Sequence, residues 1–325
     1  MKKIVGKILS AMLKTILIVI IILITLGLIS IIYLSIVDVT TKLPTHIIEK
    51  CNIEEYKFMD RNVYVVSNQE DLLENNKKTD KNLEQNTETE KIIIYFHGGA
   101  YFGEGTNKHW NFIQNVVKDT NVKVIYPDYP LAPKYMYKDV YNMVIPLYKE
   151  ILKEIENLEK EKNRNIEIIL MGDSAGGGIA LGLLQDINKE KNIKMPNETI
   201  LISPWLDTRL QNQKIDEIQK YDNISNKQTL KLAGITYAGE DGMTSSFVNP
   251  ILGEMFDLPK ISIMTGTYDI LNPDVHILEE KAKKQGASIN IYEYKEAKHI
   301  WFIEENSSQA LNKKGYKDLI DLIIN

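Results

Sequence analysis

Residues 166–178 read IEIILMGDSAGGG, an apolar run followed at once by a serine set among glycines. The apolar run predicts a buried strand, and the small and apolar residues after it predict a helix. The pattern G-x-S-x-G between a strand and a helix is typical of a tight turn that exposes the serine as a nucleophile. Gly172 and Gly176 permit that turn and a close approach of helix to strand. The pattern also fits a turn with only a packing role, so residues elsewhere in the chain must decide.

Outward from this turn, short β-branched runs alternate with segments of helical length from residue 91 onward. Continuous apolar strands between helices are typical of a mostly parallel sheet covered by helices on both faces. The sequence therefore predicts an α/β fold. The expected strands are 61–66, 91–96, 122–127, 166–171, 199–203, 261–266 and 288–294, and the expected helices are 137–162, 176–189, 276–285 and 308–324.

Two segments interrupt this alternation. Residues 206–254 contain no strand pattern between two expected strands, and excursions of that length are often lids or functional insertions. Together with residues 38–60 they are expected to form a helical cap over the carboxyl edge of the sheet; the alternative is a peripheral helical decoration. Residues 67–90 hold few large apolar side chains, which predicts a polar surface loop within an α/β domain spanning residues 61–325.

The composition excludes several classes of function. The 325 residues include 39 basic and 44 acidic side chains, for a net charge of -5, and no basic stripe is evident. Nucleic acid is therefore not an expected partner. Cys51 is the only cysteine, so neither an intrachain disulfide nor a cysteine metal cluster is expected. We expect no metal site, and the sequence does not identify a protein partner.

Residues 15–37 contain no charged side chain and as one helix would cross a hydrocarbon layer about 30 Å thick. A buried core helix and a cleaved signal peptide are the alternatives. The run is longer than the apolar region of a signal peptide, and no small-residue cleavage site follows it. The sequence therefore predicts a transmembrane anchor over 15–37, followed by a tether over 38–60.

Cationic side chains gather before this run, at Lys2, Lys3, Lys7 and Lys14. Because loops rich in lysine and arginine stay on the cytoplasmic side, residues 1–14 are expected to be cytoplasmic. The catalytic domain is then expected outside the cytoplasm, on a single-pass membrane protein.

A serine hydroxyl needs a base to take its proton, and the base needs an orienting acid. Of the five histidines, His299 follows the last expected strand and precedes the last helix, where a loop returns over the sheet edge. Its position also satisfies the order serine, acid, histidine. We therefore expect His299 to be the base. The other histidines are His46, His97, His109 and His276.

The acid is expected at the same sheet edge. Asp269 comes three residues after the strand that ends near Gly266. Asp274 is the competitor, but it lies further along and is expected to start the next helix as a capping residue. We therefore favour Asp269.

Negative charge on a tetrahedral intermediate needs donors already in place. Residues 97–102 read HGGAYF directly after an expected strand. Gly98 and Gly99 are candidates to present backbone N–H groups there, and the N–H of Ala175 is a third. Read alone, a Gly-Gly turn after a strand is common.

Six motifs together resemble the hormone-sensitive lipase branch of the α/β-hydrolases, from about residue 91 to the end of the chain. They are HGGAYF (97–102), YPLAP (129–133), GDSAGGG (172–178), SPWLD (203–207), GTYDIL (266–271) and KHIWF (298–302). The resemblance implies an α/β-hydrolase fold with a helical cap and no metal or organic cofactor. It also implies Ser174 as nucleophile, Asp269 as acid and His299 as base, with Gly98, Gly99 and Ala175 as the oxyanion hole.

The chain departs from this pattern at two places. Ile300 and Trp301 follow His299 where the family usually has glycine, and Ile270 follows Asp269 where it usually has proline. Neither change removes a reactive group. We expect Tyr101, Ile300 and Trp301 near the substrate pocket, with a core role as the alternative for Tyr101.

The leading hypothesis is a membrane-anchored serine hydrolase that cleaves carboxylic esters of short or medium acyl chains. A deacetylase of amides or of acetylated cell-surface glycans would use the same three residues. A binding module that keeps the fold without turnover is a third possibility, and the intact serine, aspartate and histidine argue against it.

Overall fold

The computed structural model describes residues 15–23, 25, 27, 38–69 and 90–325. Its centre is an eight-stranded sheet with the order β1-β2-β4-β3-β5-β6-β7-β8. The pairs β1–β2 and β2–β4 are antiparallel, and the remaining pairs are parallel. The predicted α/β fold with a mostly parallel sheet is confirmed.

The strands are β1 Cys51–Phe58, β2 Arg61–Asn68, β3 Glu90–Phe96, β4 Lys123–Pro127, β5 Ile166–Asp173, β6 Glu198–Ile202, β7 Lys260–Gly266 and β8 Ile289–Tyr294. The helices are α2 Thr45–Ile48, α4 Asn107–Thr120, α5 Tyr137–Lys162, α6 Ser174–Ile187, α7 Lys214–Ile218, α8 Lys227–Ala238, α9 Asn272–Lys284, α10 Trp301–Glu304 and α11 Gln309–Ile324, with 3-10 turns η1 Gly242–Thr244 and η2 Pro250–Leu252. Every strand and helix expected between residues 61 and 325 is present; β1 and the helices α2, α4 and α10 were not predicted.

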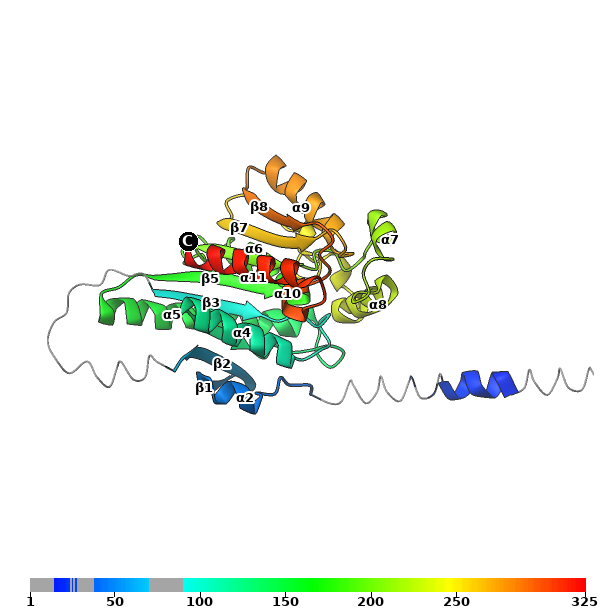
Figure 1. Ribbon diagram of the computed structural model, residues 1–325, viewed down its shortest axis with the longest axis horizontal. Coiled ribbons are helices and arrows are strands. Elements are labelled where there is room, and N and C mark those ends of the chain that lie inside the picture. The colour runs from blue at the N-terminus through cyan, green and yellow to red at the C-terminus, as the bar shows by residue number, and fades with distance from the viewer. Residues whose placement is uncertain (1–14, 24, 26, 28–37, 70–89) are drawn as a thin grey trace, which may run out of the picture.

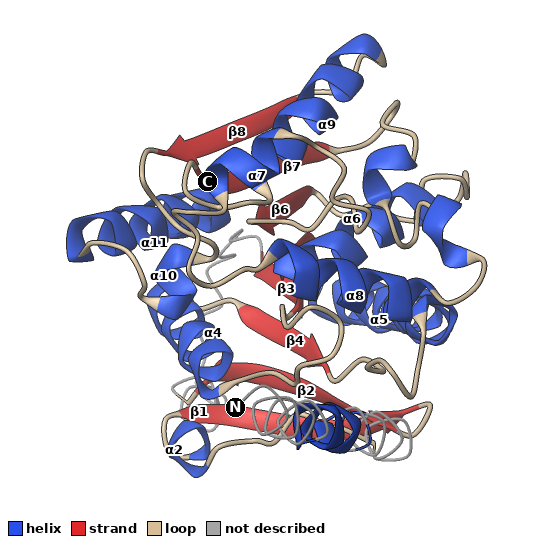
Figure 2. Ribbon diagram, turned by 90° about the vertical axis from the view of Figure 1, so that its right-hand side faces the viewer, coloured by secondary structure: helices blue, strands red, loops and turns tan. Residues whose placement is uncertain are grey.

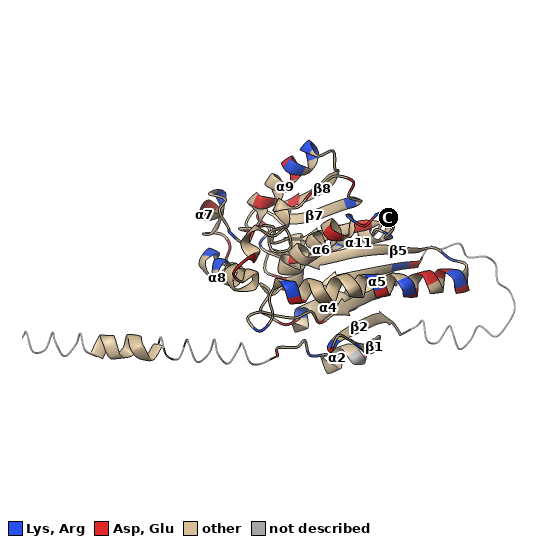
Figure 3. Cartoon of the chain, turned by 180° about the vertical axis from the view of Figure 1, so that it is seen from behind, with Lys and Arg blue, Asp and Glu red and all other residues tan. Residues whose placement is uncertain are grey.

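Helices cover both faces of the sheet. Helices α4, α10 and α11 lie on one face, and α5, α6 and α9 lie on the other (Figure 2). Along β3 the side chains alternate between two apolar cores: Ile92 and Ile94 belong to one, Ile93 and Tyr95 to the other. Successive side chains of a strand point to opposite faces, so a strand buried on both faces must be apolar throughout. Acidic and basic residues occur together on the outer sides of α5 and α9 (Figure 3).

The prediction for residues 38–60 needs correction. Residues 51–58 form β1, which pairs with β2 along its whole length at the edge of the sheet, so they belong to the body of the protein. Many β1 side chains are exposed or half-buried, as on an edge strand, and this weakens the apolar signal. Before β1, Thr41 donates its N–H to the Asp128 carboxylate at 2.9 Å, which holds the start of this segment beside the end of β4.

Residues 206–254 contain α7, α8, η1 and η2 and no strand. Helices α7 and α8 lie beyond the arrowheads of β3 and β5, at the carboxyl edge of the sheet (Figure 1). We call residues 206–254 the cap segment. Most of the expected polar loop 67–90 lies outside the described residues, and Ser67 and Asn68 belong to β2.

The predicted anchor is described only in part. Residues 15–23, 25 and 27 are helical, and the rest of 15–37 lies outside the described residues, as do residues 1–14. In the part of the chain that the structure describes, no helix has both the length and the apolar character needed to cross a membrane. The apolar side chains of residues 16–23 are exposed.

Candidate active site

Ser174 lies where β5 ends and α6 begins, with φ at 51°. A serine in this left-handed region is strained, and such strain is common at functional turns. The flanking glycines are required by space. A Cβ on Gly172 would collide with the carbonyl oxygen of Gly176, and one on Gly176 would collide with the carbonyl oxygen of Phe96. The turn therefore needs glycine on both sides of the serine.

The structure brings Ser174, His299 and Asp269 into one hydrogen-bonded chain. Ser174 Oγ lies 2.9 Å from His299 Nε2, and His299 Nδ1 lies 3.0 Å from Asp269 Oδ2. All three side chains are buried. In the arrangement suited to catalysis, the serine hydroxyl donates to Nε2, and Nδ1–H donates to the carboxylate.

The electrostatics favour a charged imidazole at His299. Burial alone lowers the pKa of His299, but the charge and hydrogen bond of Asp269 outweigh it, helped by the charges of Asp222 and Asp173, and raise the pKa to about 9. This environment stabilises the imidazolium that forms when the histidine takes the serine proton.

The two candidate acids contact different partners in the structure. Asp269 follows β7, and its Oδ1 accepts the N–H of Leu271 at 2.9 Å. Asp274 lies in the first turn of α9, but its Oδ1 accepts from Asn212 of the cap segment at 3.0 Å. Helix α9 begins earlier than expected, and no side-chain cap from Asp274 starts it. Burial raises the pKa of Asp274 to about 6.

The histidine loop is held by side chains from several elements. The Ile300 N–H donates to Ser203 Oγ at 3.1 Å, and Asn306 Nδ2 donates to the His299 carbonyl oxygen at 2.9 Å. Ile300 has φ at 41°, a left-handed conformation that strains a β-branched residue. This is the position where the family usually has glycine.

The pocket role expected for Trp301 needs correction. Trp301 is fully buried, its Nε1 donates to the Leu311 carbonyl oxygen at 3.2 Å, and its ring packs on Tyr294. Ile300 belongs to the same apolar core, on the face covered by α4 and α11. These two residues follow the base in sequence, but the short helix α10 turns them into the core.

Tyr101 belongs to the HGGAYF loop, and its buried side chain contacts the cap segment. Its ring stacks on Tyr237 of α8, with centroids 3.7 Å apart and planes within 2°, and on Trp205 at 5.3 Å. Neither the Tyr101 hydroxyl nor the Tyr237 hydroxyl has a hydrogen-bond partner among the described residues. Tyr101 therefore joins the cap segment to the loop after β3.

The three candidate oxyanion donors differ in what they contact. The N–H of Gly98 donates to Asp173 Oδ1 at 2.9 Å, so it is already engaged and the expectation for Gly98 needs correction. Gly99 is exposed, with φ at 125°, and within the described chain no hydrogen bond involves its N–H. The N–H of Ala175 lies in the first turn of α6, where helix N–H groups lack partners within the helix. Gly99 and Ala175 thus remain the candidates.

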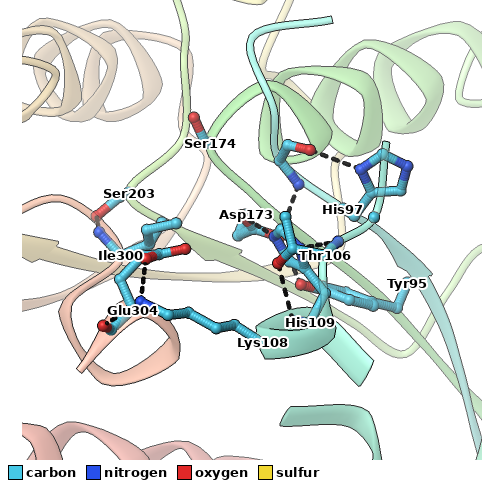
Figure 4. A network of polar contacts seen from close by, with 12 residues as sticks. Tyr95, His97, Thr106, Lys108, His109, Asp173, Ser174, Ser203, Ile300 and Glu304 are labelled. Atoms are coloured by element: carbon cyan, nitrogen blue, oxygen red, sulfur yellow. Dashed lines mark hydrogen bonds and ion pairs between the residues drawn. The ribbon is translucent and has the colours of Figure 1, made fainter. Parts of the chain in front are cut away.

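Sequence reasoning missed a second polar network, centred on Asp173 (Figure 4). Its carboxylate accepts from the Tyr95 hydroxyl at 2.5 Å and lies 3.4 Å from His109 Nε2. Burial alone would raise the pKa of Asp173, but His109 and Tyr95 outweigh it and lower the pKa. Because Asp173 also holds Gly98, this network fixes the HGGAYF loop beside Ser174. The only sequence signal was the aspartate inside the quoted motif.

The remaining histidines lie apart from this chemistry. Burial, as the largest effect, lowers the pKa of His97 to about 3, so its ring is neutral; Nδ1 lies 2.6 Å from the Gly98 carbonyl oxygen. His46 contacts Asn111, and His276 contacts Glu293. Across residues 38–69 and 90–325, with the described part of 15–27, no group of three or more His, Cys, Asp and Glu side chains is placed to hold a metal ion.

Comparison with known proteins identifies the fold family. A family model described as the alpha/beta hydrolase fold matches residues 93–303. An esterase of Acinetobacter venetianus is 28% identical over 206 residues, covering 63% of this chain and 65% of that protein, slightly less than two thirds of its length. An acetyl-hydrolase of Streptomyces hygroscopicus is 22% identical over 211 residues, covering 65% of this chain and 68% of that protein.

Solved structures share the fold. A solved structure from Staphylococcus aureus, described as a candidate esterase, superposes with a TM-score of 0.72 at 22% identity, covering 87% of each chain. A hormone-sensitive lipase from a metagenome library gives a TM-score of 0.69 at 19% identity, covering 85% of this chain and 86% of that one. The chain belongs to the α/β-hydrolase fold family, in its hormone-sensitive lipase branch.

Proposed function

We propose that the protein is a serine esterase that cleaves carboxylic esters of short or medium acyl chains through an acyl-Ser174 intermediate. The observation that carries this proposal is the chain of hydrogen bonds from Ser174 through His299 to Asp269, set on a strained turn. Nucleophile, base and acid within hydrogen-bond reach of one another are the arrangement that activates a serine hydroxyl.

In the acylation step, Ser174 Oγ attacks the ester carbonyl carbon while His299 Nε2 takes the hydroxyl proton. Asp269 holds the ring by its Nδ1–H and stabilises the imidazolium. The N–H groups of Gly99 and Ala175 donate to the negative oxygen of the tetrahedral intermediate. The C–O bond to the alcohol then breaks, and Nε2–H protonates the leaving alkoxide.

In the deacylation step, His299 takes a proton from water, and the resulting hydroxide attacks the acyl-serine. The second tetrahedral intermediate collapses to the free acid, and Ser174 regains its proton from the imidazolium. Both steps use the same base and the same donors, so no further group is required.

The names of related proteins support a small acyl group. Relatives include an acetyl-hydrolase and an ethyl acetate hydrolase of Pseudomonas putida, the latter 25% identical over 167 residues. We infer that acetyl and butyryl esters are better substrates than long-chain ones.

The test is a panel of p-nitrophenyl esters from acetate to palmitate on the full-length protein, with Ser174→Ala as control. We expect hydrolysis of the short esters and a loss of roughly 10⁴-fold or more in kcat for the variant. Equal rates in both proteins would refute the mechanism. An amide and an acetylated sugar in the same panel test the deacetylase alternative.

A fluorophosphonate probe tests whether Ser174 is activated at all. Labelling of the wild type that disappears in Ser174→Ala supports the esterase, because the reaction needs an activated hydroxyl. A folded wild-type protein that takes no label would instead support a binding module.

We also propose that residues 15–37 anchor the protein in a membrane, with the catalytic domain outside the cytoplasm. The support is the uncharged run itself and the cations before it. The connection between this run and the folded domain is short, because Asp38, the first residue after the run, pairs with Arg61 at 2.6 Å. We infer that the catalytic domain lies against the membrane surface.

Fractionation of cells tests the anchor. We expect the full-length protein in the membrane fraction after alkaline carbonate extraction, and we expect protease added outside intact cells stripped of their wall to degrade the catalytic domain. Recovery of the protein in the carbonate supernatant contradicts the anchor. Protection from external protease contradicts the proposed orientation.

A further inference from the structure

Two consecutive residues of the cap segment contact the chain on both sides of the candidate acid. The ring of Tyr221 stacks on Tyr268, with centroids 4.4 Å apart and planes within 8°. The carboxylate of Asp222 accepts the N–H of Ile270 through Oδ2 at 3.1 Å. Tyr268 and Ile270 are the immediate neighbours of Asp269. The cap segment therefore holds the loop that presents Asp269 to His299.

The Asp222 side chain also forms hydrogen bonds within the cap segment. Its Oδ1 accepts the N–H groups of Ile224 and Ser225, each at 2.9 Å, and the side chain is buried. Gln219 Nε2 donates to the carbonyl oxygens of Asp222 and Ser225. One carboxylate thus joins a turn of the cap segment to the acid loop, which comprises residues 267–271.

The acid loop divides its N–H groups between two carboxylates. The Ile270 N–H donates to Asp222, and the next N–H, that of Leu271, donates to Asp269. Movement of the cap segment away from this loop would break the Ile270 bond, which is next in the chain to the Leu271 bond that orients the Asp269 carboxylate. The position of Asp269 is therefore coupled to the position of the cap segment.

Burying two neighbouring carboxylates, those of Asp222 and Asp269, is electrostatically unfavourable. Burial raises the pKa of Asp222, and the charge of Asp269 raises it further, whereas His299 and the N–H groups of Ser225 and Ile270 lower it. Three carboxylates act on His299: Asp269 from the acid loop, Asp222 from the cap segment and Asp173 from the end of β5.

We propose that Asp222 is a positioning residue for the candidate acid, and that with Tyr221 it makes the catalytic strength of His299 depend on the placement of the cap segment. Asp222 acts through the Ile270 N–H and through its charge, and Tyr221 acts through the ring of Tyr268. This inference rests on the proposed esterase function. It adds that displacement of the cap segment weakens the base as well as opening the site.

The first test compares Asp222→Asn with Asp216→Asn, an exposed acid of α7 in the same cap segment. For Asp222→Asn we expect kcat on p-nitrophenyl acetate to fall roughly tenfold with little change in KM, because geometry at the reacting atoms is lost rather than binding. We also expect the acidic limb of the kcat/KM profile to move to lower pH by about one unit, because a charge favouring the imidazolium is gone. Asp216→Asn should match the wild type in both.

Variants of Tyr221 test the effect of position without changing a charge. The side chain is half exposed, so we expect substitutions there to leave the protein folded. We expect Tyr221→Ala to lower kcat several-fold while the pH limb stays in place, and Tyr221→Phe to retain activity because the ring still stacks. If neither Asp222→Asn nor Tyr221→Ala changes kcat while both remain folded by circular dichroism, the proposal is overturned.

A titration of the ¹⁵N-labelled histidines by NMR removes the dependence on activity, with His299 assigned from the His299→Ala spectrum. A lower His299 pKa in Asp222→Asn than in the wild type supports the positioning role even if no ester is hydrolysed, in which case only the esterase proposal fails. An unchanged His299 pKa in an active esterase overturns the role of Asp222 and leaves the esterase intact.

Discussion

Two buried histidine–carboxylate pairs lie close to Ser174, and they differ in what the second ring nitrogen faces. His299 contacts Asp269 at 3.0 Å, and its Nε2 faces the serine hydroxyl at 2.9 Å. His109 lies 3.4 Å from Asp173, but its Nδ1 accepts the N–H of Thr106 at 3.0 Å. The first pair joins an acid to a nucleophile, and the second joins an acid to the start of a helix.

The comparison shows that a histidine beside an aspartate does not by itself define a base. Since Nδ1 of His109 accepts a backbone hydrogen bond, Nε2 is the ring nitrogen that donates toward Asp173. No ring position is left to take a proton from Ser174. Figure 4 shows Ser174 pointing away from this pair. The His109–Asp173 pair therefore holds the loop of Gly98, and the His299–Asp269 pair is arranged for proton transfer.

Matched alanine variants of the two histidines give the largest contrast. We expect His299→Ala to lower kcat by roughly 10⁴-fold or more, because the serine loses its base. His109→Ala should keep kcat within about tenfold and lose about 1–3 kcal/mol of unfolding free energy, because Asp173 loses a buried partner. Steady-state kinetics and urea denaturation measure the two effects. Similar losses of kcat in both variants would erase the proposed difference between the pairs.

The two candidate acids give the next contrast. Asp269→Asn should lower kcat by roughly 10³–10⁴-fold, because the amide no longer fixes the imidazole tautomer or stabilises its charge. Asp274→Asn should change kcat only a few-fold, since this side chain contacts Asn212. Single-turnover release of p-nitrophenol measures both. A greater loss with Asp274→Asn would reverse the assignment.

The pH profile probes the charge state of the base. His299 acts as a base only when neutral, and its pKa is raised to about 9. Activity is therefore low below that pKa and rises with pH: log kcat/KM should climb with unit slope to about pH 9 and then level, roughly a hundredfold gain from pH 7. The same profile in Asp269→Asn should turn at lower pH, because the main charge favouring the imidazolium is absent. A wild-type profile already flat at pH 7 would contradict the raised pKa.

Substitution of Asp173 by asparagine is expected to give the smallest change in kcat. In Asp173→Asn the amide oxygen can still accept from Tyr95 and Gly98, so kcat should fall only a few-fold. Asp173→Ala leaves both donors without an acceptor, and we expect it to lose about 3 kcal/mol of unfolding free energy. Thermal and urea unfolding of the two variants, measured beside kcat, test this order. If Asp173→Asn is as damaging as Asp269→Asn, the second pair takes part in catalysis.

Most of the fold followed from local patterns. The strands β3, β5, β6 and β7 are mostly apolar because helices cover both faces of the sheet, and the sequence shows these apolar runs. Strand β1 escaped because its side chains are largely exposed or half-buried. Helix α4 escaped although Thr106 caps its start and its buried residues lie along one face.

The candidate site followed from chain order, because parallel strands end at the same edge of the sheet and the residues after them must meet there. That reasoning named Ser174, Asp269 and His299, whose hydrogen bonds span separations of 125 and 30 residues. It did not predict that the Gly98 N–H binds Asp173 or that Trp301 turns into the core.

By itself, the sequence determined which segments become strands and helices and which reactive side chains reach the carboxyl edge, because both depend on local periodicity and on strand direction. Only the tertiary structure decided the partners of those side chains. Asp222 meets Ile270 across 48 residues because the cap segment folds back on the acid loop, and His109 meets Asp173 across 64 because α4 packs against β2 and β4 on one face of the sheet. Such contacts depend on how whole elements pack, and no local pattern encodes them.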